Sequence, residues 1–429
     1  MSHSNAVLRD GFRHKGTVPP VEKWLLEQIF KAIGPAPLRF VVRGGAEASP
    51  PGVSPAATVV LNDWRTLVKL IADPEMVFGE AYADGRIEVE GDLATALEVV
   101  YRSWPEGRAE RSPFPRLMSK WLNRLQNNTL RGSRNNIHRH YDLGNDFYKL
   151  WLDSQLVYTC AYFPSQSDTL ETAQEAKLDY VCRKVGLQAG ETVVEAGCGW
   201  GALALHMAEH YGVSVKAFNV SHEQIVYARR QAAERGLSGR IEFIEDDYRN
   251  ISGAFDVFVS VGMLEHVGLS HYAEFGEVIH RAVGDRGRGF LHFIGRSYEG
   301  DFSRWIRKRI FPGAYAPTLG EAMRVLQPHQ YAVLDVENLR LHYAKTLEHW
   351  LARFEKSSEQ VAGMFDPWFQ RAWRLYLAGS LAAFRAGTLQ LFQITFAGSQ
   401  SAPVSWTRSS LYTNGRGSSE GSRCMSATS

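Results

Sequence analysis

The stretch VVEAGCGWGA, residues 193–202, decides the fold class of this chain. Apolar residues lead into three glycines, Gly197, Gly199 and Gly201, and a pattern typical of a helix follows over 201–211. A glycine-rich turn between a strand and a helix is where open α/β sheets bind nucleotide-like ligands. The spacing is GxGxG rather than the GxGxxG of dinucleotide-binding proteins, and no Gly-Lys-Ser/Thr phosphate loop follows. A tight turn without a ligand is the alternative interpretation.

The segments after this turn alternate between strand-like and helix-like patterns. We predict strands at 192–197, 213–220, 241–247, 256–262 and 289–295, with helices at 201–211, 222–236 and 271–283. Such alternation predicts a parallel sheet covered by helices, and therefore an α/β fold class. Two helical stretches, 344–358 and 366–386, precede a last predicted strand at 389–398.

The length of 429 residues makes two domains the default expectation. We predict a small α+β domain at residues 1–105, a linker at 106–135 and the α/β domain at 136–398. Residues 399–429 are rich in serine and glycine, so we predict a disordered tail there. Lys plus Arg (48) nearly balance Asp plus Glu (46), so the net charge of +2 identifies no partner. We expect no nucleic-acid partner.

The four cysteines show no paired or metal-ligand spacing, which favours a reducing compartment and no metal site. The N-terminus lacks the apolar core of a signal peptide, and no uncharged apolar stretch is long enough to span a bilayer. We therefore predict a cytoplasmic protein.

Acidic residues near the glycines favour a cationic ligand over a phosphate. Glu195 precedes the turn, and Glu245 and Asp246 follow the third strand. The second strand ends in Asn219 instead of the acid that binds the ribose of a dinucleotide. S-adenosylmethionine carries an ammonium and a sulfonium and no phosphate, so it fits these residues. Alternatively, Glu195 only holds the loop through backbone N–H groups.

Three further segments combine polar and apolar residues in unusual ways. HRHYDLGNDFYKLWLDSQLVYTCAYF (138–163) is dense in aromatic residues, VSVGMLEHVG (259–268) places Glu265 past a strand end, and FLHFIG (290–295) places His292 in an apolar strand. Catalytic groups of such sheets lie past strand ends. The alternatives are ordinary packing, a salt-bridged loop acid and a satisfied core histidine.

Together these segments resemble the cyclopropane-fatty-acyl-phospholipid synthase family, including its mycolic-acid-modifying relatives, over residues 135–397. The motifs that carry the likeness are HYDLGNDFY, YTCAYF, ETAQEAKLDY, GCGWG, NVSHEQ, VGMLEHVG, LHFIG and FRAGTLQLFQITF. The resemblance implies a class I methyltransferase fold, Rossmann-like and mostly parallel with a last antiparallel strand. It makes residues 136–398 an S-adenosylmethionine-dependent catalytic domain. Residues 1–105 resemble, more weakly, the small lipid-carrier-like domain of the bacterial synthases.

The resemblance implies an enzyme that adds a methylene group to the cis double bond of an acyl chain in a membrane phospholipid. Methyl transfer to the alkene generates a carbocation, and a bound bicarbonate then removes a proton so that the ring closes. The family's bicarbonate ligands map onto Cys160, Glu265, His292, Ile294 and Tyr343. The aromatic faces of Tyr343, Tyr158 and Phe293 are expected to stabilise the cation.

For S-adenosylmethionine, the resemblance implies Gly197, Gly199 and Gly201 at the methionine portion, with Tyr158 and Thr159 closing over its end. Gln224 is expected at the ribose hydroxyls, and Glu245 and Asp246 near the adenine. Asn219 completes the predicted cofactor-binding set.

The segment DFSRWIRKRIFPG (301–313) interleaves basic and bulky apolar residues, which suits anionic lipid headgroups. A solvated helix that covers the active site is an equal alternative. We expect a homodimer that contacts the inner face of the membrane peripherally. Three other functions stay open: a relative that makes methyl- or methylene-branched chains, an N-methyltransferase of small amines, and a non-catalytic lipid-binding paralogue.

Overall fold

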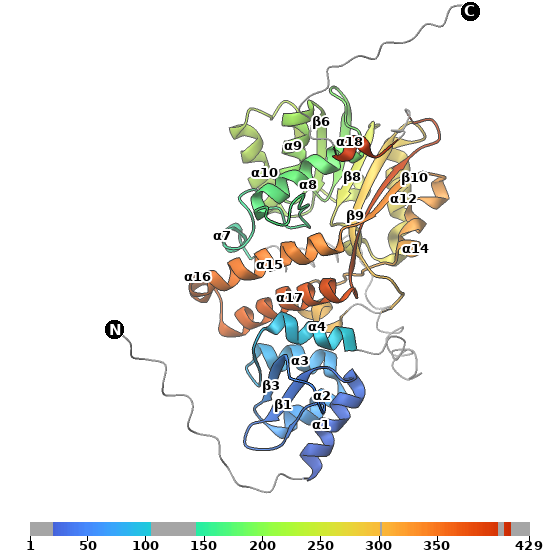
Figure 1. The fold of residues 1–429 in the computed structure, drawn as a ribbon. Helices are drawn as coiled ribbons and strands as arrows, with labels where there is room; N and C mark the ends of the chain where they lie inside the picture. Colours follow the sequence, from blue (N-terminus) through green and yellow to red (C-terminus); the bar gives the residue numbers. More distant parts are fainter. Residues whose placement is uncertain (1–19, 104–142, 301–302, 402–406, 413–429) are drawn as a thin grey trace, which may run out of the picture.

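The computed structural model describes residues 20–103, 143–300, 303–401 and 407–412. Figure 1 shows a small unit of the N-terminal residues at one end and a larger unit at the other, with α15 and α17 between them. The predicted linker at 106–135 and most of the predicted tail at 399–429 lie outside the described residues.

The small unit is built on a four-stranded sheet with the order β2-β1-β3-β4, in which β1 and β3 run parallel. The observed sheet and helices confirm the expected α+β composition of this unit. Asp73 begins α3 because its side chain accepts a hydrogen bond from the backbone N of Met76, and Pro74 occupies the first helical position. The elements are α1 (Pro20–Ile33), β1 (Leu38–Val42), β2 (Glu47–Ala48), β3 (Ala57–Leu61), α2 (Trp64–Ala72), α3 (Pro74–Ala83), β4 (Ile87–Glu90) and α4 (Leu93–Ser103).

The large unit contains a seven-stranded sheet with the order β10-β11-β9-β8-β5-β6-β7. Strands β5 to β9 are all parallel to one another, and β11 is antiparallel to both β9 and β10. This confirms the predicted α/β fold with an antiparallel strand near one edge. The strands are β5 (Thr192–Ala196), β6 (Ser214–Asn219), β7 (Ile241–Glu245), β8 (Val257–Val261), β9 (Arg288–Gly295), β10 (Ala332–Asn338) and β11 (Gln390–Ala397).

Helices cover both faces of this sheet. Val193 packs with residues of α8, α9 and α10, whereas its neighbour Val194 packs with residues of α12 and α14 on the other face. The alternation follows from the two-residue period of a strand, and burial on both faces explains the continuous apolar runs. The helices are α7 (Asn145–Lys149), α8 (Leu170–Lys184), α9 (Ala202–Tyr211), α10 (His222–Glu234), α11 (Leu264–Val267), α12 (Tyr272–Val283), α13 (Arg304–Arg309), α14 (Leu319–Ala322), α15 (Arg340–Lys356), α16 (Ser358–Met364), α17 (Pro367–Ala386) and α18 (Ser409–Tyr412).

The edge strand β10 is missing from the sequence-based expectation. Its residues AVLDVEN are mostly exposed or half-buried, and β11 is its partner in the sheet. A register shift between Val333 and Asp335 interrupts the pairing. An edge strand with polar residues and a bulge carries a weak periodic pattern, so propensity alone does not reveal it.

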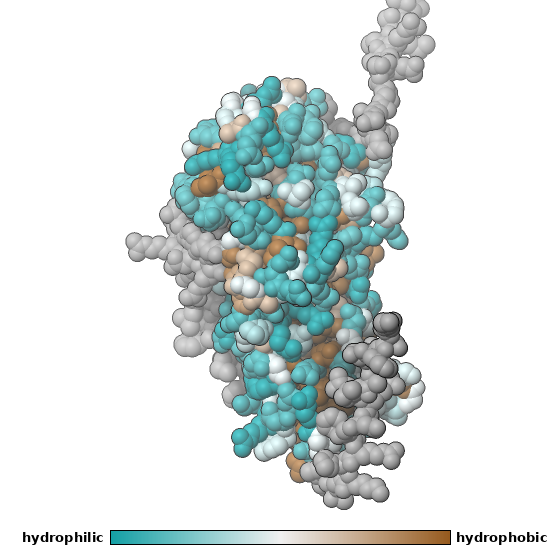
Figure 2. Space-filling model, turned by 90° about the vertical axis from the view of Figure 1, so that its left-hand side faces the viewer, coloured by the Kyte–Doolittle hydropathy of each residue, from teal (hydrophilic) through white to brown (hydrophobic). Residues whose placement is uncertain are grey.

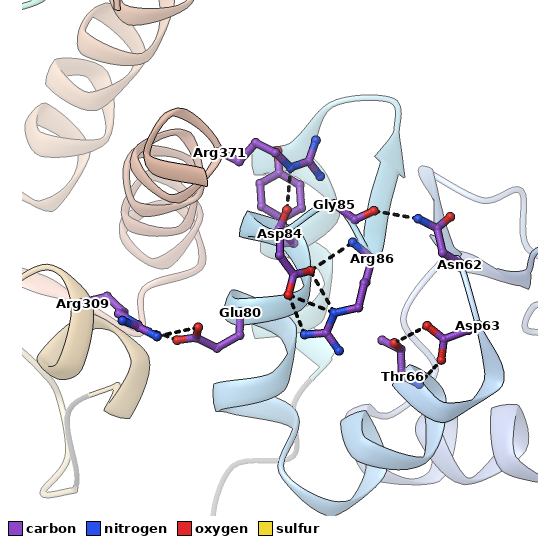
Figure 3. Close-up of polar contacts among 10 residues, drawn as sticks. Asn62, Asp63, Thr66, Glu80, Asp84, Gly85, Arg86, Arg309 and Arg371 are labelled. Carbon is purple, nitrogen blue, oxygen red and sulfur yellow. Dashed lines mark hydrogen bonds and ion pairs between the residues drawn. The ribbon is translucent and has the colours of Figure 1, made fainter. Parts of the chain in front are cut away.

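Helix α13 joins the small unit to the large one. Trp305 is 3% exposed, and its ring lies so close to Gly79 of α3 that a Cβ there would be 2.4 Å from it. Arg309 and Glu80 point toward each other and form an ion pair of 2.7 Å (Figure 3). Arg304 forms a second ion pair with Asp73, at 2.8 Å. Trp305, Arg304 and Arg309, which contributed to the expected membrane surface, therefore contact the small unit instead.

Helix α17 supplies the other half of this contact. Arg371 of α17 points toward the small unit (Figure 3). It donates hydrogen bonds to the backbone oxygens of Tyr82 (2.6 Å) and Ile87 (2.9 Å), and its guanidinium lies over the ring of Tyr82. The side of the molecule drawn in Figure 2 is mostly hydrophilic, with hydrophobic residues gathered in small areas. None of the helices in the described ranges is long and apolar enough to cross a bilayer.

Candidate active site

The glycine turn follows β5 and leads into α9. Gly197 and Gly201 have φ values of +84° and +86°, which favour glycine over any residue with a side chain. A Cβ on Gly201 would lie 2.7 Å from the ring of Phe243, so the close packing of α9 on the sheet also requires glycine. Trp200 is fixed inside the turn because its indole N–H donates to Asn145 Oδ1 at 2.7 Å. Asn145, the first residue of α7, therefore fixes the turn through Trp200.

Asn219 at the end of β6 contacts this turn and also Gln224 in the first turn of α10. Asn219 Nδ2 donates to the backbone oxygen of Gly199 at 3.3 Å and to Gln224 Oε1 at 2.7 Å. Gln224 is 3% exposed, and its Nε2 has no hydrogen-bond partner among the described residues. A buried amide donor without a partner is costly unless a ligand accepts from it. These two residues lie where the resemblance places the cofactor.

The acidic residues after β7 differ in their environments. Glu245 is exposed and pairs with His222 at 2.8 Å, which raises the pKa of that imidazole. Asp246 Oδ1 accepts from the backbone N of Asp247 (2.8 Å) and from Asn250 Nδ2 (2.9 Å). The backbone N of Asp246 donates to Asn219 O at 3.0 Å, so this loop lies beside the end of β6.

The segment Tyr158–Cys160 lies over the same edge of the sheet. The hydroxyls of Tyr158 and Tyr376 are 2.8 Å apart, and the Tyr158 ring packs on those of Trp151 and Trp350. Thr159 Oγ1 accepts a hydrogen bond from Lys177 Nζ at 3.0 Å. The loop is thus held by aromatic packing on one side and by α8 on the other.

Glu265 lies in α11, just after β8, and contacts Ile294 of the neighbouring strand β9 directly. The backbone N of Ile294 donates to Glu265 Oε1 at 2.6 Å. Glu265 is 8% exposed, and its other oxygen, Oε2, has no partner among the described residues. Burial raises the pKa of this carboxyl to about 7, although the Ile294 amide acts in the opposite direction. Near neutral pH this group is able to hold or release a proton.

His292 lies two residues before Ile294 on the same face of β9. Its Nδ1 lies 3.1 Å from Gln393 Nε2. With the amide as donor, Nδ1 accepts and the ring proton resides on Nε2. Burial lowers the pKa of His292 well below its usual value, so the ring is neutral. Nε2 is buried and finds no partner in the described part of the chain, which leaves a directed N–H donor.

Cys160 and Tyr343 connect to this cluster through the backbone. Cys160 Sγ lies 4.0 Å from Leu339 O, which also accepts from the backbone N of Tyr343 at 3.1 Å. Leu339 N donates to Leu391 O, and Leu391 is the strand partner of Ile294. A series of backbone contacts therefore links Cys160 and Tyr343 to Ile294, which in turn contacts Glu265.

One sequence-based expectation for this cluster needs correction. Phe293 points to the opposite face of β9 from His292, where its ring packs on Phe392, so it does not share a wall with Tyr158. The Ile294 amide donates to Glu265, so in this structure it orients the carboxylate. Burial also raises the pKa of the Cys160 thiol far above its usual value, and the thiol donates to Ala161 O at 3.1 Å.

Sequence analysis did not predict two residues that contact the site, Lys177 and Gln393. Lys177 lies on the apolar side of α8, which otherwise buries residues such as Leu178 and Val181. A charged residue on the apolar face of a helix is a signal that periodicity analysis can detect. Gln393 orients His292 from the antiparallel strand β11, and only the strand register reveals that pairing.

The strand order, the glycine turn and the polar ends of β6 and β7 define a class I S-adenosylmethionine-dependent methyltransferase. A family model described as mycolic acid cyclopropane synthetase matches residues 128–394. The chain belongs to this cyclopropane synthase family of methyltransferases. A second model, for a domain of unknown function, matches residues 27–106.

Similar proteins carry two kinds of names. A probable fatty acid methyltransferase of Pseudomonas putida is 34% identical over 377 residues, which cover 84% of this chain and 93% of the relative. The cyclopropane-fatty-acyl-phospholipid synthase of Escherichia coli strain K12 is 38% identical over 258 residues, 60% of this chain and 66% of that protein. The solved structure of mycolic acid cyclopropane synthase CmaA1, complexed with SAH and CTAB, matches with a TM-score of 0.59 at 30% identity, over 61% of this chain and 97% of that one.

Proposed function

We propose that this enzyme uses S-adenosylmethionine to form a cyclopropane ring at the cis double bond of an unsaturated acyl chain in a membrane phospholipid. The family membership and the buried cluster at the ends of β8 and β9 support this proposal. The observation that carries it is the buried carboxylate of Glu265, which the backbone amide of Ile294 orients.

The reaction sets clear demands on the site. A new C–C bond joins the transferred methyl carbon to one alkene carbon while the S–CH3 bond breaks. The other alkene carbon becomes cationic, and ring closure requires that one proton leaves the methyl group. A site for this chemistry excludes water and places a proton acceptor near the cation.

Two buried atoms fit a bound bicarbonate. His292 Nε2–H is a donor, and Glu265 Oε2 is an acceptor for a hydroxyl, and neither has a partner among the described residues. When bound, bicarbonate supplies the base that accepts the proton released on ring closure. Gln393 keeps the His292 proton on Nε2, and Ile294 keeps the Glu265 carboxylate in place.

Aromatic side chains surround the loop that closes over the cofactor. The rings of Tyr158, Trp350 and Tyr343 pack in sequence, with centroid separations of 5.3 and 5.9 Å. Such rings exclude water and present negative faces to a cation. This environment suits an apolar chain with a transient positive charge better than a small hydrophilic amine.

A second candidate function is methyl transfer that yields a methyl- or methylene-branched acyl chain. The Pseudomonas putida relative, named a probable fatty acid methyltransferase, matches this chain over 84% of its length. The same carbocation gives a branched product when a hydride shift precedes proton loss. Glu265 and His292 serve either outcome.

A product assay separates these functions. Purified enzyme is incubated with S-adenosylmethionine and vesicles of a cis-monounsaturated phospholipid, with and without added bicarbonate, and the acyl chains are analysed by mass spectrometry and proton NMR. A gain of one CH2 with shielded ring-proton signals supports cyclopropanation. The same gain in mass with olefinic methylene signals supports the branching reaction. Unchanged lipids, with cofactor still bound, would redirect the search to small amines.

The wider setting of this activity is also proposed. We infer a homodimer that meets the cytoplasmic face of the membrane peripherally, with the small unit in a lipid-carrier-like role. Lys308 of α13 is exposed and keeps its charge available for headgroups. Vesicle flotation with and without anionic lipid, together with light scattering, tests these two expectations.

A further inference from the structure

Helix α8 carries two buried lysines with different partners. Lys184 forms ion pairs with Asp335 at 3.1 Å and Glu337 at 2.6 Å, so its charge is matched within the protein. Lys177, two helical turns earlier, is 2% exposed and donates to the hydroxyl of Thr159 at 3.0 Å. Burying an ammonium without a paired anion costs folding free energy. We therefore asked which function the charge of Lys177 serves.

The acids nearest to Lys177 do not match its charge. Asp153 Oδ1 and Oδ2 each accept a backbone N–H at 2.9 Å, from Val157 and Gln155. Asp153 and, less strongly, Glu195 attract the Lys177 ammonium from a distance. Neither forms an ion pair with Lys177 in the described part of the chain. Burial therefore lowers the pKa of Lys177 to about 8. An additional anion beside it would be stabilised.

Lys177 determines the direction of the Thr159 hydroxyl. An ammonium has three donors and no acceptor, so Thr159 Oγ1 must be the acceptor in their hydrogen bond. The hydroxyl proton of Thr159 is then directed elsewhere. The side chain is also confined on its other side, because its Cγ2 lies 2.8 Å from the position that a Cβ on Gly262 would take.

The backbone of the same loop is held by α8 as well. Gln174 Nε2 donates to the backbone oxygens of Val157 (3.2 Å) and Thr159 (2.9 Å). Gln174 and Lys177 are one helical turn apart, so one side of α8 fixes both the main chain and the side chain of Thr159. Thr159 is consequently a preorganised donor beside a buried positive charge.

We propose that Lys177 is the positioning residue for the α-carboxylate of S-adenosylmethionine. It orients the Thr159 hydroxyl toward that carboxylate and offsets its negative charge. This inference rests on the proposed placement of the methionine portion beside Thr159. Lys177 acts through Thr159 on a part of the ligand that takes no part in methyl transfer, so its effect lies in binding.

Two ligands that differ in the carboxylate alone test this role. Calorimetry compares S-adenosylhomocysteine with its decarboxylated analogue, which keeps the amine, for wild type and Lys177→Met. We expect the variant to bind S-adenosylhomocysteine about tenfold or more weakly, the size of a lost hydrogen bond to a charged group, and the analogue as wild type does. Thr159→Val is expected to show the same selectivity, and the double variant to add little further loss.

Lys184→Met is the matched control, since it removes a buried lysine from the same helix without touching Thr159. It should leave the preference between the two ligands unchanged. Equal losses for both ligands in Lys177→Met would mean a merely structural role and overturn the proposal. If that variant does not fold, wild-type affinity of Thr159→Val for S-adenosylhomocysteine overturns it. If the wild-type enzyme binds neither ligand, the proposed cofactor site is wrong as well. If it binds both ligands equally, only the role of Lys177 is wrong.

Discussion

The carboxylate of Glu265 and the backbone amide of Ile294 lie 2.6 Å apart, although 29 positions separate them in the sequence. Parallel pairing of β8 with β9 brings them together, because the carboxyl ends of both strands reach the same edge of the sheet. The contact leaves one carboxylate oxygen without a partner among the described residues. This arrangement leads to the first two predictions.

Glu265→Gln should lower turnover by about 100-fold or more while cofactor affinity changes little, because the amide keeps the shape but loses the charged acceptor. Steady-state rates on phospholipid vesicles and calorimetry with S-adenosylhomocysteine measure the two effects. Glu321→Gln is the control, since that buried acid caps α14 and reaches Glu265 only through Tyr315, whose hydroxyl donates to Glu321 and whose backbone N donates to Glu265 O. Equal losses of turnover and cofactor binding in Glu265→Gln would contradict the assigned role.

The stability of the ligand-free protein should depend on pH through Glu265. Its folded-state pKa of about 7 lies above the ordinary value of 4.5, so its stabilising contribution is complete below pH 4.5 and is lost as pH rises through about 7. Glu265→Gln lacks this titrating group. Its free energy of unfolding should therefore rise, relative to that of wild type, by up to about 3 kcal/mol between pH 5 and pH 8. Thermal melts of both proteins at several pH values measure the difference, and a difference that is independent of pH would refute it.

Trp305 should contribute more to the contact between the two units than the charged pairs around it do. Trp305→Ala removes a buried ring packed on Gly79 and is expected to cost about 3–5 kcal/mol. Arg309→Met breaks a partly exposed ion pair with Glu80 and is expected to cost about 1 kcal/mol or less. Melting temperatures and limited proteolysis compare the two variants, and the reverse order of stability would disprove the assignment.

Two glycines of the turn should respond differently to the same substitution. Gly201→Ala forces a Cβ to within 2.7 Å of Phe243 at a φ of +86°, so it should unfold α9 locally and abolish cofactor binding. Gly199→Ala has a φ of +54° and meets nothing within 4 Å, so it should cost only the conformational strain of about 1–2 kcal/mol. Circular dichroism measures the helix content of both variants, and calorimetry measures their cofactor affinity. Similar losses in the two variants would contradict the prediction.

Much of the fold was predictable because its signals are local. The run into Gly197 and the alternation that follows predict a parallel sheet, which the structure confirms. Helix α3 carries weaker local signals, because Gly79 lies inside it and Gly85 follows it, whereas the cap at Asp73 and packing on Trp305 favour the helix. Strand β10 was missed because an exposed edge strand gains its stability from its partner β11.

The sequence by itself determined the family, the glycine turn and the residue types of the site, since each depends on short motifs that can be recognised without the tertiary structure. Only the tertiary structure decided how those residues act on one another. It turned Phe293 away from the site, used the Ile294 amide to orient Glu265, and placed Gln393 against His292. It also brought Lys177 to Thr159 in the interior. Hydrogen-bond direction and burial depend on which strands and helices become neighbours, and that is a property of packing between segments remote in the chain.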